Sequence, residues 1–539
     1  MKHRLSLLIT LFWAASLCAQ VQIHVDNPAT WNAKELKPFV GQTVVFDVPI
    51  VVCNNAGYSL TVSTRRLFSP TNQARPLSDE YKTIMNLNAE GAMNLSGAPS
   101  RTNDNPYRCG EKIYNLKVKV NSPTDLQWIS GDFRGNKRAD LENADIRAMV
   151  NADGCDECLL VCTMNLEYYL AVDFDPHSSM GPDNLAEHQK QRTKIKKALS
   201  KINADLFGFV EIQQGQDALI EICNDLNTLL PGRHFLYIDD KSKPSGTYTK
   251  SGFIYDSNKL RRIGELQEID TRVPNRKKMI CFEEIKTKER FIFSVNHFKA
   301  KSGSGATGKD ADQGDGQGQF NASRCEEAQA VVDQYKRYRP QLKEKDILLM
   351  GDLNALGMED PIRLMVNDNG MIDLHRAFHA DSSYSYRQLD ATLAGYLDHA
   401  ICNGTLFPQV TGVAAFHINS DELDKYTYDK SNDNTMFRCS DHDPVIVGLK
   451  LDSTLVYDPS PAMNSYEVFT GDARKLIINN AYKDSKRSFY AIYDISGVLI
   501  EQEEIKGYLH EVEIPQKSGM YIVYVYSDGQ VYQRKMIVR

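Results

Sequence analysis

The sequence predicts a layered α/β fold for the central part of the chain, and three observations support it. Short apolar runs typical of buried strands alternate with helical segments between residues 159 and 451. Two of the runs are close enough to form a hairpin, which favours a sandwich of mixed sheets over a purely parallel sheet. Polar clusters stand at the ends of several runs or directly beside them. Strands of a layered sheet deliver such side chains to a shared cleft, so we expect the functional site there.

The first 19 residues are typical of a secretory signal. A charged start at Lys2–Arg4 is followed by a short apolar core at Leu5–Leu17, and cleavage is expected after Ala19. The apolar core is too short to span a bilayer, and no other stretch is long enough. We therefore predict an exported, soluble protein.

Cleavage would remove Cys18, which leaves ten of the 11 cysteines, and their spacing does not define disulfide pairs.

Length and charge limit the classes of protein that the chain can belong to. With 539 residues it is expected to fold as more than one domain. The net charge of -7 gives no overall attraction for nucleic acid or an anionic membrane. Any surface that binds phosphate must therefore be a local basic patch.

Residues 20–155 are predicted to form a β-rich unit. Strand-like runs occur at Thr43–Cys53, Ser59–Ser63 and Leu116–Val120, and the first of them is interrupted at Asp47 and Pro49. The layout resembles a small OB-like domain. Such domains often bind oligonucleotides, but a structural spacer would explain the pattern equally well.

The central unit, residues 159–451, contains eight predicted strands, three predicted helices and one long polar loop. The strands are Leu159–Met164, Asp205–Val210, Gly252–Tyr255, Lys278–Ile285, Phe291–Val295, Asp346–Met350, Tyr396–Ile401 and Pro444–Leu449. The helices are Ala186–Ile202, Ala218–Leu229 and Ser323–Tyr338, and the loop is Ser302–Gln319. Residues 455–539 are β-patterned again, with turn signals at Ser496-Gly497 and Asp528-Gly529, and predict a small β-sandwich.

The polar clusters contain the residue types that hydrolysis of a phosphodiester requires. A divalent cation needs hard oxygen ligands, which Glu211, Asp441, Asn165 and Glu167 can supply. His442, between Asp441 and Asp443, is the candidate general base. Asp398 is the candidate carboxylate that fixes the His442 tautomer, and Asp352 with Asn354 is expected to orient water and phosphate. His297 is the candidate donor to the phosphate or to the leaving group.

Each cluster alone has a plainer explanation. A glutamate after a strand is usually a strand end turning to solvent, Gly351-Asp352-Leu353-Asn354 alone is an Asx turn, and a single histidine is more often structural than catalytic. Together the clusters occur in one order, each at a strand end, within one unit of domain size. That conjunction favours a shared active site.

The residues Asn165, Glu211, His297, Asp352, Asn354, Asp398, Asp441 and His442, in this order, resemble the site of the endonuclease/exonuclease/phosphatase superfamily, which has the deoxyribonuclease I-like fold. The resemblance implies a four-layer α/β sandwich of two packed mixed sheets. It also implies the roles just given and a cation at Glu211. Mg²⁺ is expected, with Ca²⁺ or Mn²⁺ as alternatives.

One stretch narrows the resemblance further. Asn296–Lys301, followed by Ala311–Gly318 and Asn321–Arg324, is similar to the loop of extracellular bacterial deoxyribonucleases. The loop is expected to line a DNA groove with Lys299, Lys301 and Arg324 on phosphates. Two alternatives stay open, a plain disordered loop and a second cation site on three acids, Asp310, Asp312 and Asp315.

The chain departs from the family at one position. Relatives usually have an acidic residue in a Gly-Thr-Asp run, where it can pair with the leaving-group histidine, and here the run is Gly246-Thr247-Tyr248. This departure weakens the expected acid role of His297 unless Tyr248 or another carboxylate substitutes.

The C-terminal unit resembles the sorting domain of type IX secretion cargo, on Gly519–Val523, Asp528-Gly529 and Lys535–Val538. An ordinary accessory β-domain is the alternative.

Taken together, the sequence predicts a secreted or surface-held metal-dependent endonuclease that acts on DNA, with RNA as a possible substrate. The alternatives are a phosphomonoesterase, a sphingomyelinase-like phospholipase, and a non-catalytic nucleic-acid or surface-binding protein.

Overall fold

The computed structural model describes residues 21–452, apart from 57–58, 152–156, 178–179, 247, 270, 272, 380–381 and 388–391. In the C-terminal unit it describes 467–470, 475–479, 489–494, 498–505, 509–513, 519–527 and 530–538. The predicted signal segment and the two C-terminal turn signals lie outside these residues. Among the described residues, no helix is long and apolar enough to cross a membrane.

The N-terminal domain is built on one seven-stranded sheet with the order β1-β2-β6-β3-β4-β5-β7. Its strands are β1 (Val21–Ile23), β2 (Thr43–Phe46), β3 (Ile50–Asn54), β4 (Leu60–Ser63), β5 (Met93–Ser96), β6 (Lys112–Ser122) and β7 (Asp125–Arg134). Strands β6 and β7 also pair with each other, so five strands close into a ring around an apolar core that includes Val52 and Leu116. The helical elements are η1 (Ala33–Phe39), α1 (Pro70–Gln73), α2 (Asp79–Gly91), α3 (Arg138–Glu142) and α4 (Ile146–Met149). The expected break between β2 and β3 at Asp47 and Pro49 is present.

The central domain contains two six-stranded mixed sheets. The first has the order β10-β11-β9-β8-β19-β18, with β8 (Leu159–Tyr169), β9 (Leu206–Gln213), β10 (Phe235–Tyr237), β11 (Thr249–Asp256), β18 (Val410–Ala415) and β19 (Val445–Leu449). The second has the order β12-β13-β14-β15-β17-β16, with β12 (Leu260–Glu268), β13 (Lys277–Glu284), β14 (Arg290–His297), β15 (Ile347–Asp352), β16 (Met371–Asp373) and β17 (Asp398–Asn403). The predicted hairpin is β13–β14. Strands β10, β12, β16 and β18 were not expected from the sequence.

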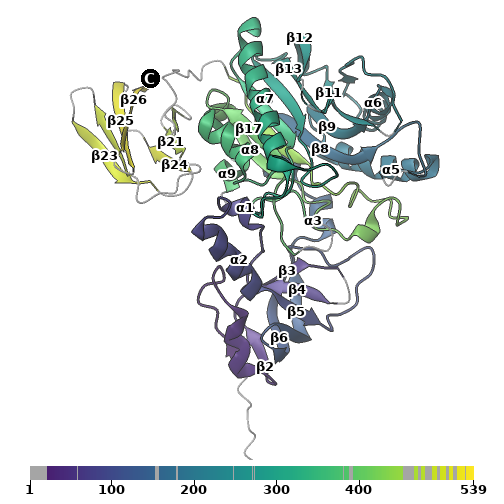
Figure 1. Ribbon diagram of the computed structural model, residues 1–539, viewed down its shortest axis with the longest axis vertical. Helices are drawn as coiled ribbons and strands as arrows, with labels where there is room; N and C mark the ends of the chain where they lie inside the picture. The colour runs from purple at the N-terminus through teal and green to yellow at the C-terminus, as the bar shows by residue number, and fades with distance from the viewer. Residues whose placement is uncertain are drawn as a thin grey trace, which may run out of the picture.

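Three apolar cores show how these sheets are layered. Alternate residues of one strand point to opposite faces, so Leu159 and Val161 of β8 pack between the sheets while Leu160 and Cys162 pack under helices. The helices on the first sheet are α5 (Leu185–Ile202) and α6 (Asp217–Leu229), and those on the second include α7 (Asn321–Leu342) and α8 (Asp360–Arg363). The order helix, sheet, sheet, helix is visible in Figure 1. It buries both faces of each sheet, which explains the near-continuous apolar runs in the sequence.

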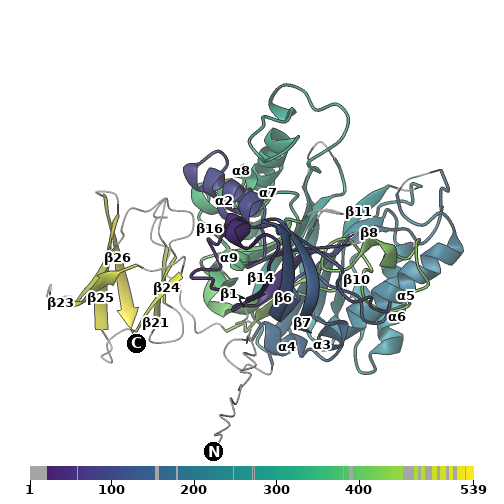
Figure 2. The ribbon, with the colours of Figure 1, turned by 90° about the horizontal axis from the view of Figure 1, so that it is seen from below.

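The remaining helical segments of the central domain are short. They are η2 (Gly308–Asp310), η3 (Leu364–Asp368), α9 (Leu374–His379), η4 (Phe407–Gln409) and η5 (Asp424–Tyr426). Figures 1 and 2 show the N-terminal domain lying against one end of the central domain. The contact includes a parallel β-bridge between Phe68 and Ala394.

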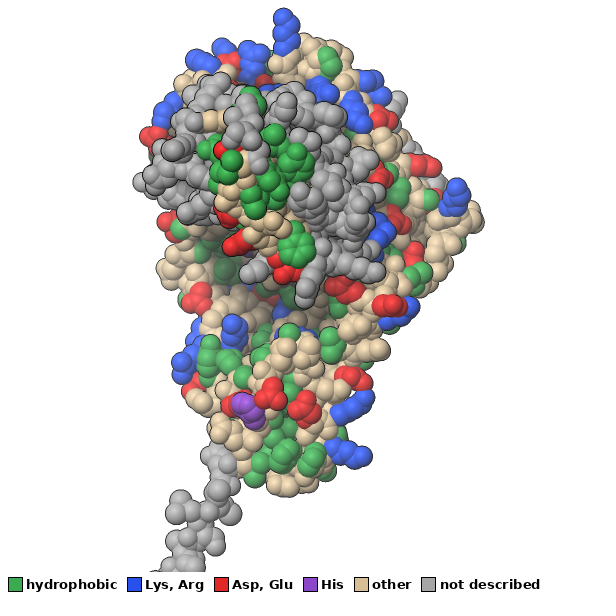
Figure 3. Space-filling model, turned by 90° about the vertical axis from the view of Figure 1, so that its left-hand side faces the viewer, with side chains coloured by type: hydrophobic (Ala, Val, Ile, Leu, Met, Phe, Trp, Pro, Cys, Tyr) green, Lys and Arg blue, Asp and Glu red, His purple; other side chains and the backbone are tan. Residues whose placement is uncertain are grey.

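The C-terminal unit has a three-stranded sheet, β20-β21-β24, and a four-stranded sheet, β23-β22-β25-β26. The strands are β20 (Glu467–Thr470), β21 (Lys475–Asn479), β22 (Phe489–Asp494), β23 (Leu499–Glu504), β24 (Leu509–Glu513), β25 (Gly519–Ser527) and β26 (Gln530–Val538). Apolar side chains gather on the face of this unit in Figure 3, and its exposed apolar residues include Leu499 and Met520. The all-β composition matches the sequence prediction.

Candidate active site

The ends of three strands in the second sheet bring three of the predicted residues side by side. Strands β14 and β15 are parallel and pair His297 with Asp352, and the antiparallel pairing of β15 with β17 places Asp398 opposite Asp352. All three side chains are buried. Because neighbouring residues of a sheet are only about 5 Å apart, the register alone assembles this part of the site.

The first sheet contributes the other side of the site. Asn165 in β8 donates from Nδ2 to Asp352 Oδ2 across the two sheets, at 3.2 Å. The backbone leaves the regular strand conformation at Glu167 and Glu211, whose φ angles are 50° and 56°. This left-handed conformation is unfavourable for residues with a side chain, and it is often kept where a side chain must be aimed at a functional site.

Asp398 and His442 form a buried hydrogen-bonded pair. Asp398 Oδ2 lies 2.7 Å from His442 Nδ1, and the Ser385 hydroxyl donates to the same oxygen at 2.7 Å. The second ring nitrogen of His442 faces Asp352 Oδ2 at 3.8 Å and Asp441 Oδ2 at 3.9 Å. Burial acts to lower the pKa of His442, but the surrounding carboxylates, chiefly Asp398, raise it well above its ordinary value.

Glu167, Glu211 and Asp441 form a cluster of carboxylates, since Asp441 raises the pKa of both glutamates and Glu211 raises that of Glu167. Burial raises the pKa of Glu211 to about 7, with further contributions from Asp441 and Asp352. Burial and then Asp441 raise the pKa of Glu167 to about 8. Glu167 Oε2 is buried without a hydrogen-bond partner among the described residues. Arg438 and Arg276 lower the pKa of Glu167 and of Glu211, respectively, by less than burial and the neighbouring acids raise it. A set of oxygen donors of this kind suits Mg²⁺, Ca²⁺ or Mn²⁺.

A second group of possible ligands lies beside this cluster, where Asp441 Oδ2 is 3.9 Å from His442 Nε2. Asp352, Asp398 and His442 each offer an oxygen or nitrogen atom within 4.8 Å of the others. Two of the three are already joined by the Asp398–His442 hydrogen bond. The residues of the site therefore fit a divalent cation, and the carboxylate cluster offers ligand atoms that are less occupied by hydrogen bonds.

His297 lies between two carboxylates without a close hydrogen bond to either. Its Nε2 is 3.6 Å from Glu211 Oε1 and 3.7 Å from Asp352 Oδ2. Burial, together with the positive charge of Arg276, holds the pKa of His297 well below its ordinary value. A neutral imidazole at neutral pH can still donate one hydrogen bond from its N–H group.

Asp352 and Asn354 are held in one tight turn after β15. Asp352 Oδ1 accepts from the Asn354 backbone N–H at 2.9 Å, and Asn354 Nδ2 donates to Phe298 O at 3.1 Å. Asn354 has a left-handed φ of 47°. Burial raises the pKa of Asp352 to about 6, with Asp398 adding to it and His442 opposing it. The Asx turn expected from the sequence is present, and it lies inside the site.

The basic residues of the long loop have different surroundings from those expected. Arg324 is fully buried and donates to the carbonyl oxygens of Lys299, Gln319 and Gln317. Lys301 forms an ion pair with the buried carboxylate of Glu359. Both residues hold this part of the chain together, and their contact with phosphate stays a prediction. Lys299 is half-buried, with its ammonium group 4.2 Å from the centre of the Phe320 ring.

The three aspartates of the same loop do not face a common point. Asp310 accepts from the backbone N–H and hydroxyl of Ser323 at the start of α7, and Asp312 accepts from Gly314 N. Asp315 accepts from the backbone and side chain of Gln317. Each aspartate stabilises its own turn, so the second cation site and the disordered loop are not supported.

Tyr248 does not replace the missing acid. Its side chain is 70% exposed, whereas the carboxylates within 4 Å of the His297 ring nitrogen, among the described residues, are those of Glu211 and Asp352. Both acids lie beside Nε2.

Several residues of the site were missed by the sequence analysis. Ser385 binds Asp398, the Tyr386 ring lies 4.6 Å from that of His442, and Asn419 Nδ2 donates to His442 O at 2.6 Å. Arg276 lowers the pKa of both Glu211 and His297. Ser385, Tyr386 and Asn419 lie outside regular strands, so periodicity could not have found them. The position of Arg276 beside β13, whose partner strand β14 ends at His297, was an available signal.

The fold and the site together define a class of protein, the hydrolases of phosphate esters and phosphodiesters. The sequence profile of the Endonuclease/Exonuclease/phosphatase family matches residues 172–442, half of the chain, and the chain belongs to this family. The match begins after Asn165 and Glu167 and ends at His442. Enzymes of the family generally use divalent metals.

The comparison with solved structures gives the same family among its matches. A family member from Bacteroides thetaiotaomicron is 18% identical, with a TM-score of 0.39, over 56% of this chain and 98% of its own. A mannosyl-6-phosphatase from the same organism is 17% identical, with a TM-score of 0.37, over 54% and 98%. TDP2 of D. rerio, solved with a single-strand DNA product, is 11% identical, with a TM-score of 0.35, over 54% and 99%. No curated protein matches the chain.

Proposed function

We propose that the protein is an endonuclease that hydrolyses phosphodiester bonds of DNA with a divalent cation. One observation carries the proposal: the buried Asp398–His442 pair lies beside the partly exposed carboxylates of Glu167, Glu211 and Asp441, with Asp441 Oδ2 3.9 Å from His442 Nε2. This arrangement combines a base for water with oxygen ligands for a cation.

His442 acts as the general base. Its Nδ1–H group donates to Asp398, which fixes the tautomer. A cation held by the carboxylates would offset the negative charge that raises the pKa of His442, and the neutral ring would then accept a proton from water at Nε2. Ser385 keeps the Asp398 carboxylate oriented. Asp352, 3.8 Å from Nε2, is close enough to help orient the water.

Glu167, Glu211 and Asp441 would hold the cation, with Asn165 at the edge of the group. When bound, the cation neutralises charge that develops on the phosphate oxygens. His297 donates a hydrogen bond to the phosphate or to the departing oxygen, and Asn354 orients the phosphate. Arg276 and Lys299 supply positive charge near these groups.

The preference for DNA rests on the resemblance of Asn296–Arg324 to the loop of extracellular bacterial deoxyribonucleases. RNA is the second polymer to test. Export through the N-terminal signal, and transfer by a type IX system through the C-terminal unit, are proposals from the sequence. Immunoblots of periplasm, cell surface and medium test them, with a chain lacking residues 455–539 as the comparison.

Incubation of the mature protein with supercoiled plasmid tests the activity. We expect nicked, then linear and fragmented DNA with Mg²⁺, Ca²⁺ or Mn²⁺, and intact plasmid in EDTA. Parallel reactions contain RNA, p-nitrophenyl phosphate or sphingomyelin vesicles. Intact plasmid in every lane, with turnover of another substrate, would replace the proposal with that activity. Intact substrates throughout, with DNA retained in chelator, would favour a binding protein.

A further inference from the structure

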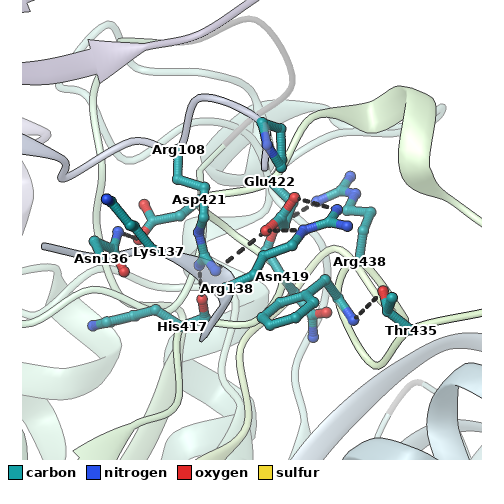
Figure 4. A network of polar contacts seen from close by, with 12 residues as sticks. Arg108, Asn136, Lys137, Arg138, His417, Asn419, Asp421, Glu422, Thr435 and Arg438 are labelled. Carbon is teal, nitrogen blue, oxygen red and sulfur yellow. Dashed lines mark hydrogen bonds and ion pairs between the residues drawn. The ribbon is translucent and has the colours of Figure 1, made fainter. Parts of the chain in front are cut away.

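A buried network of ion pairs joins the N-terminal domain to the central domain (Figure 4). Arg66 binds Asp421 at 3.0 Å, and Arg108 and Arg138 bind Glu422 at 3.2 Å and 2.7 Å. None of the three arginine side chains is more than 10% exposed, and the two acids are fully buried. Buried charges are costly to desolvate, so a flexible spacer would not require such a connection.

The two acids lie in a loop, residues 417–422, that we call the bracing loop. On one side, Arg108 donates to His417 O, and Asn136 Nδ2 donates to Asp421 Oδ2 at 2.8 Å. These groups belong to the N-terminal part of the chain, as Figure 4 shows. This side of the bracing loop is therefore fixed by the N-terminal domain.

The other side of the bracing loop holds the backbone around His442. Asn419 Nδ2 donates to His442 O at 2.6 Å, and Asn419 Oδ1 accepts from Cys439 N at 2.9 Å. The backbone N–H groups of Asn419 and Ser420 donate to Asp443 Oδ1 at 2.8 Å and 2.9 Å. The loop thus binds the chain before, at and after His442.

Aromatic stacking connects the same network to Asp398. The Tyr384 ring stacks on His417 with centres 3.8 Å apart, and its hydroxyl donates to Asp421 Oδ2 at 2.9 Å. The guanidinium carbon of Arg66 lies over the Tyr384 ring, 4.9 Å from the ring centre. The next residue, Ser385, is the one that donates to Asp398.

A second contact reaches the Asp398 side directly. Asn72 of α1 donates from Nδ2 to Ser383 O at 3.2 Å and accepts from Tyr396 N at 3.0 Å. It joins the segment that carries Ser385 to the segment that leads into Asp398. Two separate parts of the N-terminal domain therefore hold the two halves of the Asp398–His442 pair.

We infer that the N-terminal domain is a structural part of the active site. Arg66, Arg108 and Asn72 are positioning residues that fix the Asp398–His442 pair, through the bracing loop and through Ser383 and Tyr396. The expected effect of the N-terminal domain on turnover rests on the proposed function. Its expected effect on the position of the His442 ring does not. A substrate-binding module that is only attached to the enzyme would leave both unchanged.

The kinetic test compares Arg108→Met and Asn72→Ala with the control Arg134→Met, whose side chain is 62% exposed on the same domain. We expect kcat to fall by about tenfold to a hundredfold in the first two variants, because small displacements of a base cost this much. KM for DNA and the Mg²⁺ concentration for half-maximal rate should stay within about twofold. Arg108→Lys should recover part of kcat. A rise in KM with unchanged kcat would overturn the inference in favour of substrate binding.

A double-mutant cycle tests whether the effect passes through the bracing loop. Asn419→Ala removes the contact to His442, so Arg108→Met should add little to it, since both act on one path. If the fold-loss in kcat of the double variant equals the product of the losses in the two single variants, this part of the inference is overturned.

A third readout needs no activity. In protein with ¹³C-labelled histidine, the His442 ring signals, assigned with His442→Gln, should shift in Arg108→Met and Asn72→Ala but not in Arg134→Met. Shifts without any nuclease activity in the wild type would retain the positioning role and reject the proposed function. Unshifted signals in folded variants would overturn the positioning role. Should Arg108→Met not fold, Asn72→Ala, which removes no charge, decides the outcome.

Discussion

Two clusters of charged residues lie next to the segment around His442, and they are built differently. In the interdomain network each acid faces a cation, as Asp421 faces Arg66 and Glu422 faces Arg108 and Arg138. In the active site acids face acids, as Glu211 faces Asp441 and Asp352. The acids of the network are fully buried, whereas the side chains of Glu211 and Asp441 are 16% and 31% exposed, and the two clusters also differ in pairing.

The pKa values follow this difference. Burial would raise the pKa of Asp421, but Arg66, then His417 and Arg108, hold it below its ordinary value. At Glu211 burial and neighbouring carboxylates act in the same direction, and the pKa rises to about 7. A paired buried charge fixes structure, whereas a cluster of unpaired acids keeps binding capacity for a cation at a cost in stability.

The largest expected effect comes from removing the proposed general base of the active site. His442→Ala should lower kcat by about a thousandfold, equivalent to about 4 kcal/mol in the barrier, because general base catalysis is lost. The melting temperature should change by only a few degrees. Plasmid hydrolysis and thermal unfolding on one preparation check this, and near wild-type turnover would remove His442 from the mechanism.

Breaking a pair in the interdomain network should act on stability instead. Arg66→Met leaves Asp421 buried beside fewer cations, and we expect a loss of about 3 kcal/mol in the free energy of unfolding. Denaturant titration measures it, with the exposed Arg134→Met as control. A loss below about 0.5 kcal/mol would show that the buried pair is not needed for stability.

In chelator, Glu211→Gln should raise the free energy of unfolding, whereas Arg66→Met should lower it. Removing one of several mutually repelling acids should raise the free energy of unfolding in EDTA by about 1 kcal/mol, while more Mg²⁺ is needed for activity. The control is Glu283→Gln, because the Glu283 side chain is 3% exposed, against 16% for Glu211, but is paired with Arg261 and Arg290, and it should destabilise. Destabilisation by both changes in EDTA, or an unchanged Mg²⁺ titration, would contradict the assignment of Glu211.

The smallest expected effect is a pH dependence of the paired network. Because the folded pKa of Asp421 is lowered, its contribution is fully present above the unfolded value and is lost as pH falls through the folded value. The stability difference between wild type and Asp421→Asn should therefore be constant above about pH 5 and shrink by about 1 kcal/mol toward pH 3. Denaturant titrations at each pH check this, with the exposed Asp132→Asn as reference. A difference that grows on acidification would contradict the assigned sign.

The sequence by itself determined eight of the twelve strands of the central domain and much of the candidate site. Apolar runs marked β8, β9, β14, β15 and β19, because a buried strand in a layered sheet must be apolar on both faces. Glu211 follows such a run directly, and His297 and Asp352 each lie two residues after the end of one. The order of these positions predicted a shared site before the register of β14, β15 and β17 showed it.

Tertiary structure alone decided what the polar loops do. Arg324 looked available for phosphate because it follows a polar loop, yet its guanidinium binds the carbonyl groups of that loop. Ser385, Asn419 and Asn72 have no local signature, because their partners are 13 to 324 residues away in the chain. Periodicity reports which face of an element is buried, but the partner of a buried polar group depends on how distant segments meet. The N-terminal domain's hold on the Asp398–His442 pair is of this kind.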